Sequence, residues 1–171
     1  KTGTITSYER TLPTSQSAFF DKKTEQNNLI ISARTFAYSD DRKYAAKIIA
    51  TILWGNMSSR LFQNIREKLG LCYYIWARHS VADYDGMFFI RAGIDKERFD
   101  FGLENIYEEI EKFVSDGITQ EELNNAKSYL QGKLQMGIES SDEMSEFVWS
   151  DMLLYGKTKS LEEIMADYNA V

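Results

Sequence analysis

Residues Met57–Tyr73 read MSSRLFQNIREKLGLCY, and the character of this stretch changes part-way along. Its first part has apolar residues at helical spacing, namely Leu61, Phe62, Ile65 and Leu69. Gly70 then breaks the pattern, because glycine tolerates the positive φ that commonly follows a helix. The next run, LCYYIWARHS over 71–80, is aromatic and branched and predicts a strand. We therefore expect a helix over about 58–69, a turn, and a strand.

Further strands and helices are predicted on both sides of this stretch. Strand patterns occur at 17–22 (SAFFDK), 28–36 (NLIISARTF) and 86–94 (GMFFIRAGI), the last forming a hairpin with 71–80. Helices are expected over about 42–54, 98–115, 119–137, 140–156 and from 160 onward. Capping boxes at Thr119 and Ser160 support two of these starts. Strands linked by hairpins, with helices in separate blocks, predict an α+β fold: an antiparallel sheet with helices packed on it.

The composition is that of an ordinary globular domain. The chain has 171 residues, 43% of them hydrophobic and 27% charged, which suits one domain with a sizeable core. A polar tail or linker is expected over 1–15 and the domain proper over 16–171. The net charge of -6 argues against nucleic acid as a partner. No apolar run is long enough for a membrane span, and no signal core precedes the domain, so we expect an intracellular protein whose compartment stays open.

Candidate catalytic groups are few. The chain contains one histidine, His79, so it holds neither an H-E-x-x-H nor an H-x-x-E-H motif, and no zinc or other metal site is expected in it. Cys72 is the single cysteine and cannot form an internal disulfide. A nucleophilic pair of Cys72 and His79 is not expected, because an odd separation in a regular strand places them on opposite faces.

Arg66 and Tyr73 lie on either side of the Gly70 break. A structural reading accounts for both, since a cation in a last helical turn favours the helix dipole and Tyr73 is one more strand aromatic. The spacing of Arg66 and Tyr73 alone does not favour a functional role over this structural interpretation.

The motif nevertheless resembles one in the pitrilysin/insulinase family of zinc metallopeptidases, nearest to the mitochondrial-processing-peptidase-like branch. The resemblance extends over 17–171, including DDRKY at 40–44, ITQEEL at 118–123 and LYG at 154–156. In that family two similar halves face each other, and the N-terminal half carries H-x-x-E-H. This chain is similar to the C-terminal half, which lacks zinc ligands.

The resemblance implies a division of labour between two halves. Zinc and the general base would belong to the catalytic half, on the same native chain or on a partner subunit, so this chain alone is expected to be inactive. Arg66 and Tyr73 match the family's positions for an Arg and a Tyr that reach a peptide substrate. A guanidinium and a phenol can donate hydrogen bonds to a peptide backbone or to a developing oxyanion.

Two departures from the family pattern bear on these expectations. Trp54 and Asn56 stand where the family often has glycines, which affects the shape of the loop before the motif. The family continues beyond residue 171 with a helix and a strand, so the domain is expected to be truncated, and an open sheet edge there would invite a homodimer. The alternative reading is a non-peptidase homologue that acts as an assembly or peptide-binding subunit.

Overall fold

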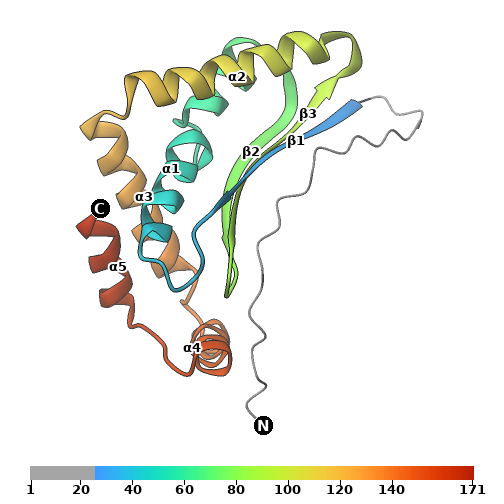
Figure 1. Cartoon of the computed structure of the whole chain (residues 1–171). Helices are drawn as coiled ribbons and strands as arrows, with labels where there is room; N and C mark the ends of the chain where they lie inside the picture. The colour runs from blue at the N-terminus through green and yellow to red at the C-terminus, as the bar shows by residue number, and fades with distance from the viewer. Residues whose placement is uncertain (1–25) are drawn as a thin grey trace.

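Three antiparallel strands make up the sheet of the computed structural model, which describes residues 26–171 (Figure 1). They are β1 (Gln26–Thr35), β2 (Cys72–Val81) and β3 (Gly86–Asp95). Their order is β1-β3-β2, so the β2–β3 hairpin is extended by β1 on the far side of β3. The predicted strand at 17–22 and the predicted boundary at 16 lie outside the described residues.

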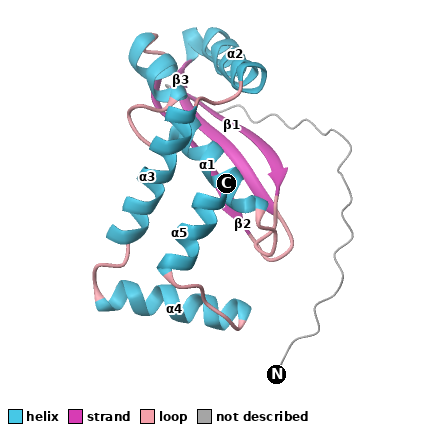
Figure 2. Cartoon of the chain, turned by 90° about the vertical axis from the view of Figure 1, so that its left-hand side faces the viewer, coloured by secondary structure: helices cyan, strands magenta, loops and turns pink. Residues whose placement is uncertain are grey.

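Helices account for most of the remaining described chain. They are α1 (Arg42–Trp54), the π-helix η1 (Phe62–Lys68), the 3₁₀ turn η2 (Lys96–Arg98), α2 (Phe99–Asp116), α3 (Gln120–Met136), α4 (Ser141–Tyr155) and α5 (Leu161–Ala170). Both views place α1, α3 and α5 on the same side of the sheet (Figures 1 and 2). This layering confirms the expected α+β class. Within residues 26–171 no helix combines the length and apolar character needed to cross a bilayer.

The core lies between the sheet and these helices. Alternate strand residues face inward, and their fully buried side chains pack against helical residues; this cluster includes Ile75, Ile90, Ala92 and Ile94 from the sheet with Leu53, Leu61, Ile65 and Ile106. A smaller cluster joins α1 to α3 through Ile48, Ile52, Ala126 and Leu130. Burial of each large aliphatic side chain contributes roughly 1.5–3 kcal/mol. On α1, Tyr44, Ile48 and Ile52 are buried, whereas Ile49 is 37% exposed.

Capping boxes begin the last three helices. At α3 the Thr119 hydroxyl accepts the backbone N–H of Glu122, whose carboxylate accepts the Thr119 N–H. The same reciprocal pair forms between Ser140 and Glu143 at α4, and between Ser160 and Glu163 at α5. Each N-cap is typically worth about 1 kcal/mol. The starts predicted at Thr119 and Ser160 are confirmed, and Ser140 caps α4.

The helix predicted over 58–69 differs from expectation. Its central part is the π-helix η1, and Leu69, expected in the buried stripe, is 38% exposed. The reason is geometric: a π-helix holds an extra residue per turn, so a side chain beyond it no longer follows the α-helical spacing. Leu61, just before η1, and Ile65, in its first turn, are fully buried.

Candidate functional site

Arg66 lies on the exposed side of η1, close to where the helical segment ends. The backbone carbonyl of Arg66 accepts the N–H of Gly70 at 3.2 Å, and the carbonyl of Ile65 accepts the N–H of Leu71 at 3.1 Å. These bonds close the segment tightly onto the following strand. The Arg66 guanidinium lies over the Phe62 ring, 5.2 Å from its centroid. In the described chain it forms no hydrogen bond or ion pair, so its donors are available.

Tyr73 is the extra residue of a β-bulge at the start of β2. Cys72 pairs with Ile94 and Tyr74 pairs with Gly93, which leaves Tyr73 without a cross-strand partner on β3. Its side chain is 61% exposed and forms no side-chain hydrogen bond within the described residues. Bulges of this kind redirect a side chain that a regular strand would place elsewhere. The phenol is therefore presented to solvent beside the same turn that carries Arg66.

The turn between the two residues is fixed by Gly70 and Arg98. Gly70 has φ +57°, a conformation that glycine adopts without steric cost. The Arg98 guanidinium donates to the carbonyls of Leu69 and Gly70, at 3.0 Å each. Arg98 and Tyr73 also line one shallow cavity of about 250 Å³, together with Gly70, Leu71, Cys72 and Asp95. Sequence reasoning did not single out Arg98, because an arginine at a helix start carries no signal of a contact 28 residues away.

Cys72 and His79 do not form a nucleophilic pair, although the predicted reason was wrong. The bulge shifts the parity of β2, so Cys72 packs against the inner core and His79 is also buried on that side. Their partners on β3, Ile94 and Phe88, are six residues apart, which is about 20 Å at roughly 3.3 Å per residue. The two side chains lie on the same face of the sheet, but they are too far apart to interact.

Neither of these groups is poised for chemistry. Burial raises the pKa of the Cys72 thiol to about 11, and the nearby charge of Arg66 opposes only part of that rise. The thiol is therefore protonated and unreactive near neutral pH. The His79 ring accepts or donates one hydrogen bond, Nε2 to Thr35 Oγ1 at 2.9 Å, and burial together with the charge of Lys47 lowers its pKa. His79 is thus a buried, neutral core histidine.

The other arginine of the motif has a structural role. Arg60 Nε and Nη2 donate to the two carboxylate oxygens of Glu122, at 2.6 and 2.9 Å, and Nη2 also donates to the carbonyl of Gly117. Its guanidinium lies 5.1 Å from the Phe113 ring centroid. The Arg60 charge is the main reason that the pKa of Glu122 falls to about 2. This contact ties the motif to the junction of α2 and α3.

Asn56 and Trp54 order the loop before the motif. The Asn56 side chain accepts the N–H of Ser58 at 2.8 Å, and its backbone carbonyl accepts the Ser59 hydroxyl at 2.6 Å. Trp54 packs on Phe62, with ring centroids 5.1 Å apart. The departures noted in the sequence therefore build a loop of their own and hold Phe62, the ring under Arg66.

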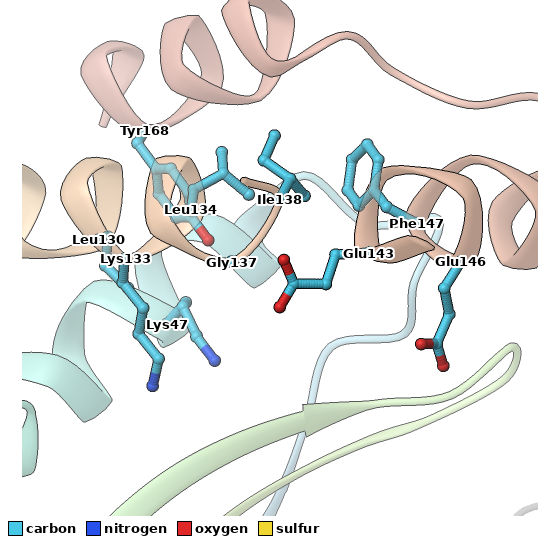
Figure 3. Close-up of a pocket in the computed structure, with 10 residues that line it drawn as sticks. All are labelled: Lys47, Leu130, Lys133, Leu134, Gly137, Ile138, Glu143, Glu146, Phe147 and Tyr168. Atoms are coloured by element: carbon cyan, nitrogen blue, oxygen red, sulfur yellow. The ribbon is translucent and has the colours of Figure 1, made fainter. Parts of the chain in front are cut away.

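A larger cavity of about 440 Å³ opens between α1, α3, α4 and α5, away from this turn (Figure 3). The ammonium groups of Lys47 and Lys133 lie on one side, and the carboxylates of Glu143 and Glu146 extend from α4 (Figure 3). Glu143 is engaged in its capping box. The cavity contains neither Arg66 nor Tyr73. Among residues 26–171 no cluster of three or more His, Cys, Asp or Glu side chains could hold a metal.

Comparison with known proteins identifies the family. The family model described as "Peptidase M16 inactive domain" matches residues 3–130 of this chain. The chain therefore belongs to the peptidase M16 inactive domain family.

A curated relative and two solved structures extend this result. The chain is 35% identical over 150 residues to a Bacillus subtilis protein named uncharacterized zinc protease YmxG, covering 88% of this chain and 37% of that protein. A peptidase M16 inactive domain structure from Pseudomonas fluorescens has a TM-score of 0.72 at 22% identity, covering 86% of this chain and 34% of that one. A chain of complex III2 from Candida albicans has a TM-score of 0.75 at 18% identity, covering 88% and 38%. These two structures share the fold, and the chain spans about a third of the length of the curated relatives it matches.

Proposed function

We propose that this chain is the substrate-binding, non-catalytic half of a zinc-dependent metalloendopeptidase. Zinc, the attacking water and the general base belong to a separate catalytic half, on the same native chain or on a partner subunit. Membership of the inactive domain family supports this division, as do relatives named zinc proteases. Arg66 and Tyr73 serve the peptide substrate rather than the metal.

The observation that carries this proposal is the pair of unengaged donors on the two sides of one fixed turn. Arg66 and Tyr73 are exposed, and neither forms a side-chain hydrogen bond within residues 26–171. A side chain that only stabilised the fold would be expected to have a partner, as Arg60 has in Glu122. The π-helix and the bulge on either side of the turn are also irregularities that occur frequently at functional sites.

The chemistry of the two groups fits peptide hydrolysis. The scissile carbonyl becomes a tetrahedral oxyanion, and donors that are already positioned stabilise that charge without reorganising. Arginine offers several N–H donors and tyrosine one O–H donor. Arg98 holds the carbonyls of Leu69 and Gly70, so the backbone between the two donors is fixed before substrate arrives.

The test is a cleavage assay with the full-length parent protein, or with this chain mixed with its catalytic half and zinc. An unstructured fluorogenic peptide is the substrate, and Arg66→Ala and Tyr73→Phe are compared with wild type. Loss of one oxyanion donor lowers kcat by roughly 10²–10³-fold, and we expect each variant to lose tens- to hundreds-fold in kcat/KM. Lys68→Ala and Tyr107→Phe are the controls. Both side chains are exposed, and neither is one of the two proposed substrate donors.

The alternative function is that of a non-peptidase homologue which assembles with other subunits or binds peptides without cleaving them. The observation that favours it is the fold shared with a chain of complex III2. If the parent cleaves no peptide under any condition, this alternative replaces the peptidase proposal. If the parent is active but indifferent to both variants, Arg66 and Tyr73 have only structural roles.

A further inference from the structure

The side of the sheet that faces away from the helices has an unusual composition. Strand alternation and pairing place fourteen residues on it, here called the outer face: Gln26, Asn28, Ile30, Ser32 and Arg34 from β1, Met87, Phe89, Arg91, Gly93 and Asp95 from β3, and Tyr74, Trp76, Arg78 and Ser80 from β2. No described helix covers it in either view (Figures 1 and 2). Three of the fourteen residues are arginines and one, Asp95 at the end of β3, is acidic, in a chain whose net charge is -6.

The three arginines lie in successive cross-strand rows. Arg34 is paired with Met87, Arg78 with Phe89, and Arg91 with both Ile30 and Trp76. All three are exposed, and within the described chain none forms a hydrogen bond or an ion pair. The nearest acid in register is Asp95, at the end of β3, and its carboxylate accepts the N–H of Glu97 as a cap. The positive charge of the outer face is therefore not neutralised by the residues around it.

Aromatic rings fill the spaces between these charges. Trp76 and Phe89 meet edge to face, with ring centroids 5.3 Å apart. The Tyr74 ring lies across Gly93, where a side chain would clash with it, and Arg91 sits 5.8 Å from the Tyr74 ring centroid. Tyr74 also donates its hydroxyl hydrogen to the Asn28 amide oxygen. Arg91 lies near the Tyr74 ring and Arg78 is in register with Phe89, and together with exposed Ile30 and Met87 they form a surface suited to acidic and apolar groups together.

The dimensions indicate a narrow occupant. Neighbouring strands are about 4.8 Å apart, so the three strands within residues 26–171 give a face roughly 10 Å wide between outer backbones. Four rows from Met87 to Gly93 extend about 20 Å at roughly 3.3 Å per residue. A stable domain interface buries about 800 Å² on each partner, which is more than a face of this size supplies. One peptide segment fits it.

We propose that the outer face binds an acidic, partly apolar segment of the peptide substrate. The inference rests on the proposed function, because it names the class of substrate for the same protein. Tyr74 directly follows Tyr73, and both belong to the bulge at the start of β2. A segment bound on the outer face therefore continues toward the turn that carries Arg66 and Tyr73.

The experiment measures equilibrium binding of fluorescein-labelled peptides to this chain alone. The probe is a 12-residue peptide of alternating Asp or Glu with Leu or Phe; the comparison peptides replace its acids with Asn and Gln, or with Lys. We expect the acidic peptide to bind at least about tenfold more tightly than either, and raising NaCl from about 50 to about 300 mM to weaken it. Arg78→Gln combined with Arg91→Gln should weaken it about tenfold.

The matched control is Arg42→Gln combined with Lys112→Gln, which removes the same charge from the helical side. Equal weakening by both double variants, or equal binding of all three peptides, would overturn the proposal. A third outcome would also overturn it: no peptide binds, and the Arg78/Arg91 double variant associates less well with the catalytic half. The outer face would then be an interface between the two halves. Because this readout needs no cleavage, it stands or fails separately from the roles of Arg66 and Tyr73.

Discussion

At the scale of single residues, His79 shows how burial sets protonation. The ring is 5% exposed, with Thr35 of β1 as its hydrogen-bond partner and the ammonium of Lys47 on α1 as the charge that acts on it. Both burial and that charge disfavour imidazolium, so the pKa of His79 lies below its ordinary 6.5. In the unfolded chain the ring takes up a proton near pH 6.5.

This difference predicts a pH-dependent stability in a defined window. Because the folded pKa is lowered, the stability from neutral His79 is present above pH 6.5 and is lost as the pH falls below it. We expect His79→Gln to reduce the drop in Tm between about pH 7.5 and 5.5 by about 2–4 °C. Thermal unfolding, monitored by circular dichroism at both pH values, measures the Tm of wild type and variant. An identical drop in wild type and variant would assign the effect to other groups.

At the scale of elements, the contact between the residues before η1 and the start of α3 explains why two arginines of one motif differ. Arg60 joins the turn before η1 to the capping box of α3 through Glu122, while the guanidinium of Arg66, on η1 itself, lies over Phe62 and forms no hydrogen bond or ion pair within residues 26–171. The carboxylate of Glu122 is thus shared between a salt bridge and a helix cap. Its lowered pKa of about 2 means that the contact is complete above pH 4.5 and is lost as the pH falls toward 2.

Substituting the two arginines separates these roles. Arg60→Ala leaves a partly buried carboxylate without its partner, and we expect the free energy of unfolding to fall by roughly 1–3 kcal/mol. Arg66→Ala removes an exposed side chain and should change it by less than about 0.5 kcal/mol. Urea unfolding of this chain at pH 7 measures both. A large loss for Arg66→Ala would show that the exposed arginine stabilises the fold and would weaken its assignment to substrate.

The regular elements were predictable from sequence, while the irregular ones were not. The bounds of α1 match the expectation, because branched and alanine positions at helical spacing define it between Asp41 and Gly55. The candidate role of Arg66 and Tyr73 was inferred from a family resemblance rather than from their spacing. The π-helix, the bulge and Arg98 left no local signal, since each depends on partners such as Ile94 or Gly70 that only the folded chain brings close.

At the scale of the whole molecule, the chain belongs to the peptidase M16 inactive domain family. It holds a single histidine, and residues 26–171 contain no cluster that could bind a metal. We expect the isolated chain to bind zinc no more tightly than a surface site does, and to cleave no peptide with zinc added. Isothermal titration with zinc and the fluorogenic assay test this together. Chelator-sensitive cleavage by the pure chain would contradict the assignment to a non-catalytic half.

The π-helix and the bulge have a consequence for how such a site can be lost. Each adds one residue to a segment that would otherwise be a regular helix or a regular strand, and the two additions lie on either side of Gly70. A one-codon deletion of an exposed residue of η1, such as Glu67, or of Tyr73 itself, would restore regular geometry and leave the core side chains in place. Small deletions in the gene could therefore silence this turn while sparing the fold, so a relative that keeps the sheet and helices need not keep the site.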